Sequence, residues 1–186
     1  MRQDRKTRYT RMVLQDSLIE LMKEKPIAKI TIKELCEKAD INRTTFYAHF
    51  TDQYHLLRAI EDETLTWVKE AAGNLIREPE KNAAIKTLER IFQYVVDNSK
   101  HLQVLLSEQG DIDFQKQLFT AIYQLCGIDP SAGHSGNGGS KELYFIFVVN
   151  GSVGLVRHWL KSGLNQSVQD IAKIIYEMAV PFIAQI

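Results

Sequence analysis

The chain has 186 residues, of which 45% are hydrophobic and 25% are charged. This apolar content is enough for the core of one or two domains, and it excludes a collagen-like or intrinsically disordered protein. The net charge of zero hides an asymmetry, because residues 1–60 carry 12 basic and 8 acidic residues whereas residues 61–186 carry 11 and 15. A basic N-terminal third on an acidic remainder indicates that this end of the molecule meets a polyanion.

No feature of the sequence suggests secretion or membrane insertion. Cys36 and Cys126 have neither disulfide-framework nor metal-site spacing, so we interpret them as small buried apolar residues in a reducing compartment. The basic start "MRQDRKTRYTR" is not followed by the apolar segment of a signal peptide. The longest nearly apolar run, Leu143 to Val156, has 14 residues and is too short to span a bilayer. We therefore expect a soluble, cytoplasmic protein.

The N-terminal segment predicts two helices. The first covers residues 8–24 and ends before Pro26. Its apolar residues recur on one helical face and are Leu14, Leu18, Leu21 and Met22. Thr31 and Glu34 have the spacing of a capping box, so a second helix is expected to start at Ile32.

A tight turn and a third helix follow. The second helix can run only about two turns before Asp40, a residue that tolerates left-handed backbone. Asn42 then caps a helix that directs Phe46 and Phe50 inward. Two short helices around a tight turn are typical of a helix-turn-helix, although the same pattern also occurs in helical packing units whose polar residues are merely solvated.

The remainder of the chain is also predicted to be helical. Thr51 and Asp52 can cap a long fourth helix that reaches about Ile76. Further helices are expected over residues 83–98, 99–106, 112–126, 141–162 and 167–185, with a Gly- and Ser-rich loop from Asp129 to Ser140. We find no strand-like alternation, so the predicted fold is all-α with about nine helices. Residues 1–52 would form one domain and residues 53–186 a second, joined by the fourth helix.

The chemistry of the third helix suits a DNA major groove. Arg43 can donate two hydrogen bonds to guanine, and the hydroxyls of Thr44 and Thr45 suit base edges. Phosphate oxygens can be contacted by Thr31, Tyr47 and His49, with non-specific attraction from Lys29, Lys33 and the basic arm at residues 2–8. A partly buried structural role is the alternative for His49.

The segment "TIKELCEKADINRTTFYAHFTDQYHLL" resembles the DNA-binding domain of the TetR (tetracycline-repressor) family of bacterial transcription regulators, and the resemblance extends over residues 8–60. It implies that Arg43, Thr44 and Thr45 lie where the family contacts bases, and that Thr31, Tyr47 and His49 lie where it contacts phosphates. There are two departures. Asp40 stands where the family usually has Gly, and Thr51 and Gln53 stand where a Lys is usual.

The C-terminal tail also resembles one subtype of that family. The similarity is carried by His158-Trp159 and by Gly163 before the last helix. In that family the C-terminal domain binds a small inducer and dimerises through its last two helices, and the resemblance implies both properties for this chain.

The charge-free run from Leu143 to Val156 independently favours a homodimer. A helix that is apolar on all sides must be covered on all sides, and a bundle of this size can hardly do so alone. A central buried helix in a monomer is the alternative. The predicted interface residues are Phe147, Gly151, Gly154, Leu155, His158, Ile171, Ile175 and Met178.

A pocket for a small-molecule effector is expected among the helices of the second domain. Its candidate residues are Trp67, Phe92, Phe114, Phe119, Tyr123, Tyr144 and Asn150. Aromatic residues at such spacings are more often simply core residues. A buried amide needs hydrogen-bond partners, and for Asn150 a ligand, the partner subunit and a backbone carbonyl are all open.

Enzymatic motifs are missing from the sequence: there is no P-loop, no H-E-x-x-H and no G-x-S-x-G, and the five His show no metal spacing. We therefore expect no catalytic activity, no metal and no cofactor. The hypothesis is a homodimeric, ligand-responsive regulator, most simply a repressor, on a palindromic operator in double-stranded DNA. The alternative is a helical adaptor or coactivator of the same fold that acts through a protein partner.

Overall fold

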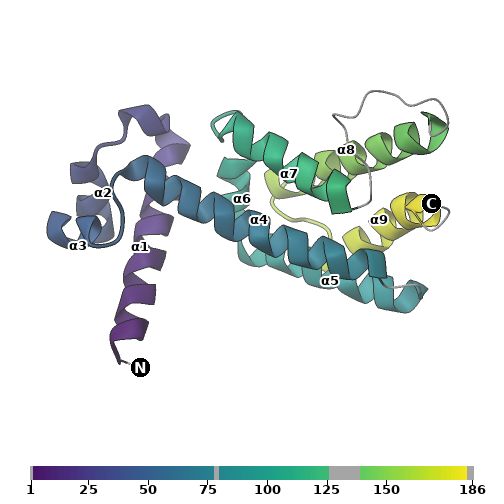
Figure 1. Ribbon diagram of the computed structural model, residues 1–186, viewed down its shortest axis with the longest axis horizontal. Coiled ribbons are helices and arrows are strands. Elements are labelled where there is room, and N and C mark those ends of the chain that lie inside the picture. The colour runs from purple at the N-terminus through teal and green to yellow at the C-terminus, as the bar shows by residue number, and fades with distance from the viewer. Residues whose placement is uncertain (1, 78–79, 126–138, 184–186) are drawn as a thin grey trace.

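The computed structural model of the protein describes residues 2–77, 80–125 and 139–183. Within these ranges the chain forms nine α-helices, one 3₁₀ turn and no strand, which confirms the all-α prediction. Figure 1 shows an elongated molecule with a small group of helices at one end and a larger group at the other. We call these the head and the body.

The head contains α1 (Arg2–Glu24), the 3₁₀ turn Ile27–Lys29, α2 (Ile32–Ala39) and α3 (Arg43–Tyr47). α1 ends shortly before Pro26, as predicted. The apolar stripe of α1 packs on α2 and α4. Its fully buried members are Leu14, Leu18 and Met22. The first turns of α1 project beyond this packing, and Arg5, Lys6 and Arg8 on them are exposed.

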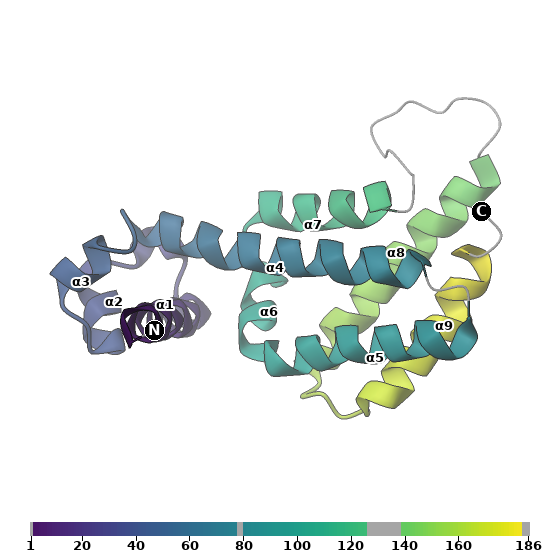
Figure 2. The ribbon, with the colours of Figure 1, turned by 60° about the horizontal axis from the view of Figure 1, so that its bottom comes forward.

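The long helix α4 (Gln53–Arg77) joins the head to the body (Figures 1 and 2). It starts where Asp52 Oδ1 accepts a hydrogen bond from the amide of His55 at 2.7 Å. Leu56, Leu57 and Ile60 are buried against the head, and later turns pack on α5 and α7. The same rigid element therefore contacts both groups of helices.

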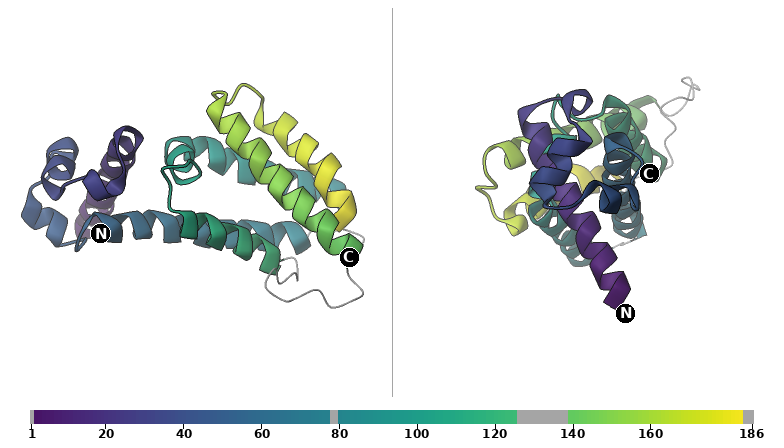
Figure 3. Two further views of the ribbon diagram at one scale, coloured as in Figure 1. Left: turned by 90° about the horizontal axis from the view of Figure 1, so that it is seen from above. Right: turned by 90° about the vertical axis from the view of Figure 1, so that its left-hand side faces the viewer.

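The body is formed by α5 (Lys81–Asp97), α6 (Ser99–Leu105), α7 (Ile112–Leu125), α8 (Gly139–Lys161) and α9 (Val168–Ile183). α5 packs against α9 and α7 against α4, and Figure 3 shows α8 and α9 side by side at the end opposite the head. Trp159 anchors the core, because its indole N–H donates to the carbonyl of Gln166 at 3.1 Å and its ring meets Phe92 edge-on.

Several predicted boundaries differ from the structure. α1 begins at Arg2 rather than near residue 8, and α8 begins at Gly139 inside the predicted loop; residues 129–138 of that loop lie outside the described ranges. α3 ends at Tyr47, so Phe50 lies in the following turn. Its side chain is nevertheless buried, and its amide donates a hydrogen bond to the carbonyl of Phe46. The domain boundary between residues 52 and 53 stays an expectation.

The turn between α6 and α7 gives a first testable prediction. A Cβ on Gly110 would lie 2.1 Å from the backbone oxygen of Leu105, and backbone cannot yield as a side chain can. Gly110→Ala should therefore lower the free energy of unfolding by about 1–3 kcal/mol. Urea unfolding of this variant and of Gln109→Ala, the same change at the exposed neighbour, measures the effect. Equal midpoints for the two variants would contradict the packing described here.

Candidate nucleic-acid interface

Local hydrogen bonds fix the angle between α2 and α3. The Thr31 hydroxyl accepts from the amide of Glu34 at 3.2 Å, and the Glu34 carboxylate accepts from the amide of Thr31 at 2.9 Å. Asp40 ends α2 in the left-handed conformation, with φ 51° and ψ 45°. Asn42 Oδ1 then accepts from the amide of Thr45 at 2.7 Å and starts α3. These bonds confirm the predicted capping box, turn and cap.

α3 has an apolar back and a polar front. Phe46 is 0% exposed and its ring centroid lies 6.1 Å from that of Phe50, which is also buried. The Arg11 guanidinium of α1 lies over the Phe50 ring, 5.1 Å from its centroid. On the opposite side Tyr47 is 57% exposed. The buried aromatic pair therefore orients the outward residues of α3.

The predicted DNA-contacting residues all lie in the head, between Lys29 and His49. Exposed members are Lys29, Thr31, Lys33, Arg43, Thr44 and Tyr47, whereas Thr45 and His49 are half-buried. The His49 ring is tilted against Phe50 at a centroid distance of 6.4 Å. We call this set of eight residues the head surface.

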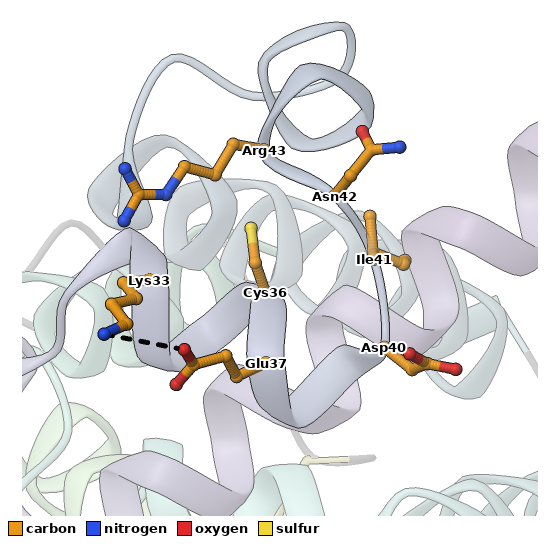
Figure 4. Close-up of a pocket in the computed structure, with 7 residues that line it drawn as sticks. All are labelled: Lys33, Cys36, Glu37, Asp40, Ile41, Asn42 and Arg43. Atoms are coloured by element: carbon orange, nitrogen blue, oxygen red, sulfur yellow. Dashed lines mark ion pairs between the residues drawn. The ribbon is translucent and has the colours of Figure 1, made fainter.

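An open hollow of 440 Å³ lies between α2 and α3. Figure 4 shows Lys33 and Arg43 extending on one side of it, opposite Asp40 and Ile41. Burial raises the pKa of the Cys36 thiol in this hollow. Glu37 lies 3.8 Å from the Lys33 ammonium, a contact that sequence reasoning missed although the i,i+4 spacing could have revealed it.

The Glu34 carboxylate opposes the binding of a phosphate at the start of α2. Its carboxylate accepts from the Lys25 ammonium at 2.5 Å and from the Thr31 hydroxyl at 2.8 Å. The Lys25 contact, with help from Thr31, lowers the pKa of Glu34 to about 2. The carboxylate is therefore charged at neutral pH, and a phosphate that approaches Thr31 must compete with it. The Lys25 contact could not be predicted, because it joins two elements across a turn.

The predicted effector residues separate into three places. Phe119, Tyr123 and Asn150 come together, and the Asn150 amide donates to the Tyr123 hydroxyl and to the Ile146 carbonyl, each at 2.8 Å. Trp67 stacks on Tyr94 with ring centroids 3.7 Å apart. Phe92 and Phe114 are buried in the main core. The side chain of Tyr144 lies outside the described part of the molecule.

The predicted dimer residues divide into an exposed and a buried group. On α8 and α9, Phe147 is 76% exposed and Met178 67% exposed, and a Cβ on Gly151 or Gly154 would meet no atom within 4 Å. His158 is exposed and Leu155 half-buried. Ile171 and Ile175 differ from the prediction, because both are buried in the core of the same chain, where α9 packs on α5.

Among the residues that the structure describes, no three His, Cys, Asp or Glu side chains converge as metal ligands. None of the helices described has the length and hydropathy needed to cross a membrane.

Comparison with known proteins matches both halves of the chain. The family model described as "Bacterial regulatory proteins, tetR family" matches residues 16–60, which include α2, α3 and the start of α4. The model described as "Transcriptional regulator C-terminal region" matches residues 82–180, more than half of the chain.

Similar individual proteins are distant in sequence. The chain is 19% identical over 172 residues to the uncharacterized HTH-type transcriptional regulator YxbF of Bacillus subtilis (strain 168), covering 89% of this chain and 43% of that protein. The chain thus corresponds to less than half of that relative's length.

Two solved structures share the fold. A TetR transcriptional regulator from Streptococcus agalactiae 2603V superposes with a TM-score of 0.56 at 19% identity, covering 96% of this chain and 97% of that one. The dihydroxyacetone kinase operon activator DhaS superposes with a TM-score of 0.53 at 16% identity, covering 95% and 96%. With both family models matched in order along the chain, the protein belongs to the TetR family of bacterial regulatory proteins.

Proposed function

We propose that the protein is a ligand-responsive repressor that binds a palindromic operator as a homodimer, with the head surface in contact with DNA. One observation carries this proposal: α3 buries Phe46 completely while Arg43, Thr44 and Tyr47 project from its other side. A helix that is held by a buried side chain in this way can enter a DNA major groove as a rigid element.

The head surface divides into base and phosphate contacts. Arg43 lies at the first position of α3, and the N-terminal residues of a recognition helix are those that reach base edges. Thr44 and Thr45 follow it there. Tyr47, His49, Thr31, Lys29 and Lys33 surround this centre and would contact phosphates. Since Glu37 and Glu34 carry negative charge beside them, we expect the operator affinity to depend strongly on the remaining basic side chains.

Dimerisation through α8 and α9 is supported by their outer face. Phe147 and Leu143 on α8 and Met178 on α9 leave large apolar side chains exposed to water, and exposed apolar patches are typical of interaction sites. Gly151 and Gly154 leave space for a helix of a second copy to approach. A two-fold axis that relates two copies would give the pair of head surfaces the symmetry that a palindrome requires.

Effector response would act through α4, because this helix contacts both the head and the body. Ligand binding near Trp67, or beside Tyr123 and Asn150, would shift α4 and thereby the spacing of the two head surfaces. An effector changes the DNA affinity only if it binds one arrangement of the two head surfaces more tightly than another.

Activation is the second candidate for the sign of regulation. DhaS, which shares the fold, is described as an operon activator. The same head surface and dimer would serve a repressor or an activator. A reporter gene under the control of the bound operator therefore distinguishes repression from activation. Reduced expression in the presence of the protein supports repression, and increased expression supports activation.

Separate substitutions at Arg43 and Tyr47 test the proposed division of the head surface. Arg43→Ala should weaken binding by about 1–3 kcal/mol at one base position and relax the preference there, because a bidentate contact to a base is lost. Tyr47→Phe should weaken all sequences to a similar extent, because it removes one phosphate contact. Binding titrations on the operator and on single-base variants measure both effects. An unchanged base preference in Arg43→Ala would contradict the assignment.

A further inference from the structure

Glu61 is a buried carboxyl in the helix that joins head and body. It lies on α4 among Leu57, Ile60 and Leu65, and it is 7% exposed. Its Oε1 atom has no hydrogen-bond partner. A buried carboxylate without partners is strongly unfavourable, so a group in this position tends to hold a proton.

The surroundings of Glu61 add negative charge. Asp111 caps α7, because its Oδ1 accepts a hydrogen bond from the amide of Asp113 at 2.7 Å. Its negative charge, and that of Asp62 on α4, disfavour a second negative charge on Glu61. Burial, then Asp111 and Asp62, raise the pKa of Glu61 to about 7, and Arg58 opposes them.

The other helices that pack on α4 direct their polar groups to other positions. From α1, Arg11 and Gln15 both contact Glu63, at 3.4 and 3.1 Å. From α5, Tyr94 stacks on Trp67. Neither helix therefore supplies a partner for the Glu61 carboxyl.

We propose that the joint between head and body, at the α4–α7 contact beside Glu61, is proton-sensitive and that protons favour the arrangement described here. An acidic medium neutralises Glu61, which then needs no ionic partner. An alkaline medium leaves Glu61 ionised beside Asp111.

The sign of the effect follows from proton linkage. Glu61 holds its proton more tightly here than in an arrangement that exposes its carboxyl to water, so its stabilisation is complete below the ordinary carboxyl pKa and is lost as pH rises through about 7. The consequence for DNA rests on the proposed function: if the joint sets the spacing of the two head surfaces, operator affinity changes with pH over the same range.

Hydrogen exchange at pH 6 and pH 8, corrected for the chemical exchange rate, tests the joint without DNA. In the wild-type protein the equilibrium for opening of residues 56–65 and 111–118 should rise about tenfold between these pH values. Glu61→Gln, which is neutral at both, should lose most of this change. Glu70→Gln makes the same substitution at an exposed position of α4 and should retain the pH dependence.

Equal pH dependence in the wild-type protein and in Glu61→Gln, or no pH dependence in either, would overturn the proposal. Operator titrations at the two pH values then test the regulatory consequence, and an affinity that does not change with pH in the wild-type protein would overturn that part. A protein that binds no selected DNA would refute the proposed function, whereas the exchange experiment would still decide on the joint.

Discussion

Phe46→Ala should lower the free energy of unfolding by about 3–5 kcal/mol, the usual cost of truncating a fully buried aromatic residue. Phe46 is 0% exposed and contacts both Phe50 and Tyr47. Its ring lies between α3 and the rest of the head, so the cavity that Phe46→Ala creates would lie directly beneath α3. We expect specific DNA binding to be lost at temperatures where the body is still folded.

Tyr47→Ala is the matched control for this prediction. It removes an aromatic ring from the adjacent position, but that ring is 57% exposed. Chemical unfolding should show a change of only about 0.5 kcal/mol or less, as for most surface substitutions, while DNA affinity falls through the lost phosphate contact. Similar losses of stability in the two variants would show that α3 is not held by its buried face.

Phe147→Asp should separate the proposed dimer. The side chain is 76% exposed in the single chain, so the substitution should leave the fold of each subunit intact. In a two-fold interface it would place two carboxylates in an apolar contact, and an uncompensated buried charge costs about 3–5 kcal/mol. The dissociation constant of the dimer should therefore rise by roughly 100-fold or more.

Analytical ultracentrifugation measures this change. The wild-type protein should sediment at twice the mass of the 21.3 kDa chain, and Phe147→Asp should sediment as the single chain at micromolar concentration. Gln117→Asp adds the same charge to an exposed position of α7 and should remain dimeric. A wild-type protein that is monomeric at this concentration would contradict the proposed interface.

Sequence alone predicted the head well because its signals are local. Thr31, Glu34 and Asn42 act within three residues of the atoms they bond, and Phe46 and Phe50 show the spacing of an inward face. The left-handed backbone at Asp40 follows from the residue type and from the shortness of α2. Such features need no knowledge of the tertiary arrangement.

The body was harder to predict because its contacts join distant segments. The periodicity of α9 identified Ile171 and Ile175 as apolar, but it could not show that α5 covers them within the same chain. Glu61 belongs to a helix with many charged residues, and its sequence gives no sign that this carboxyl is buried or that the charge of Asp111 acts on it. The same limit applies to the effector residues, whose grouping depends on how four helices meet.

Selection of bound sequences from a pool of random duplex DNA tests the central claim most directly. The account predicts enrichment of an inverted repeat whose half-sites lie about one helical turn apart, or a multiple of it, roughly 34–36 Å from centre to centre. Two chains should bind each duplex, and affinity should fall steeply with salt concentration. Enrichment of no sequence, or of a single half-site bound by one chain, would contradict it.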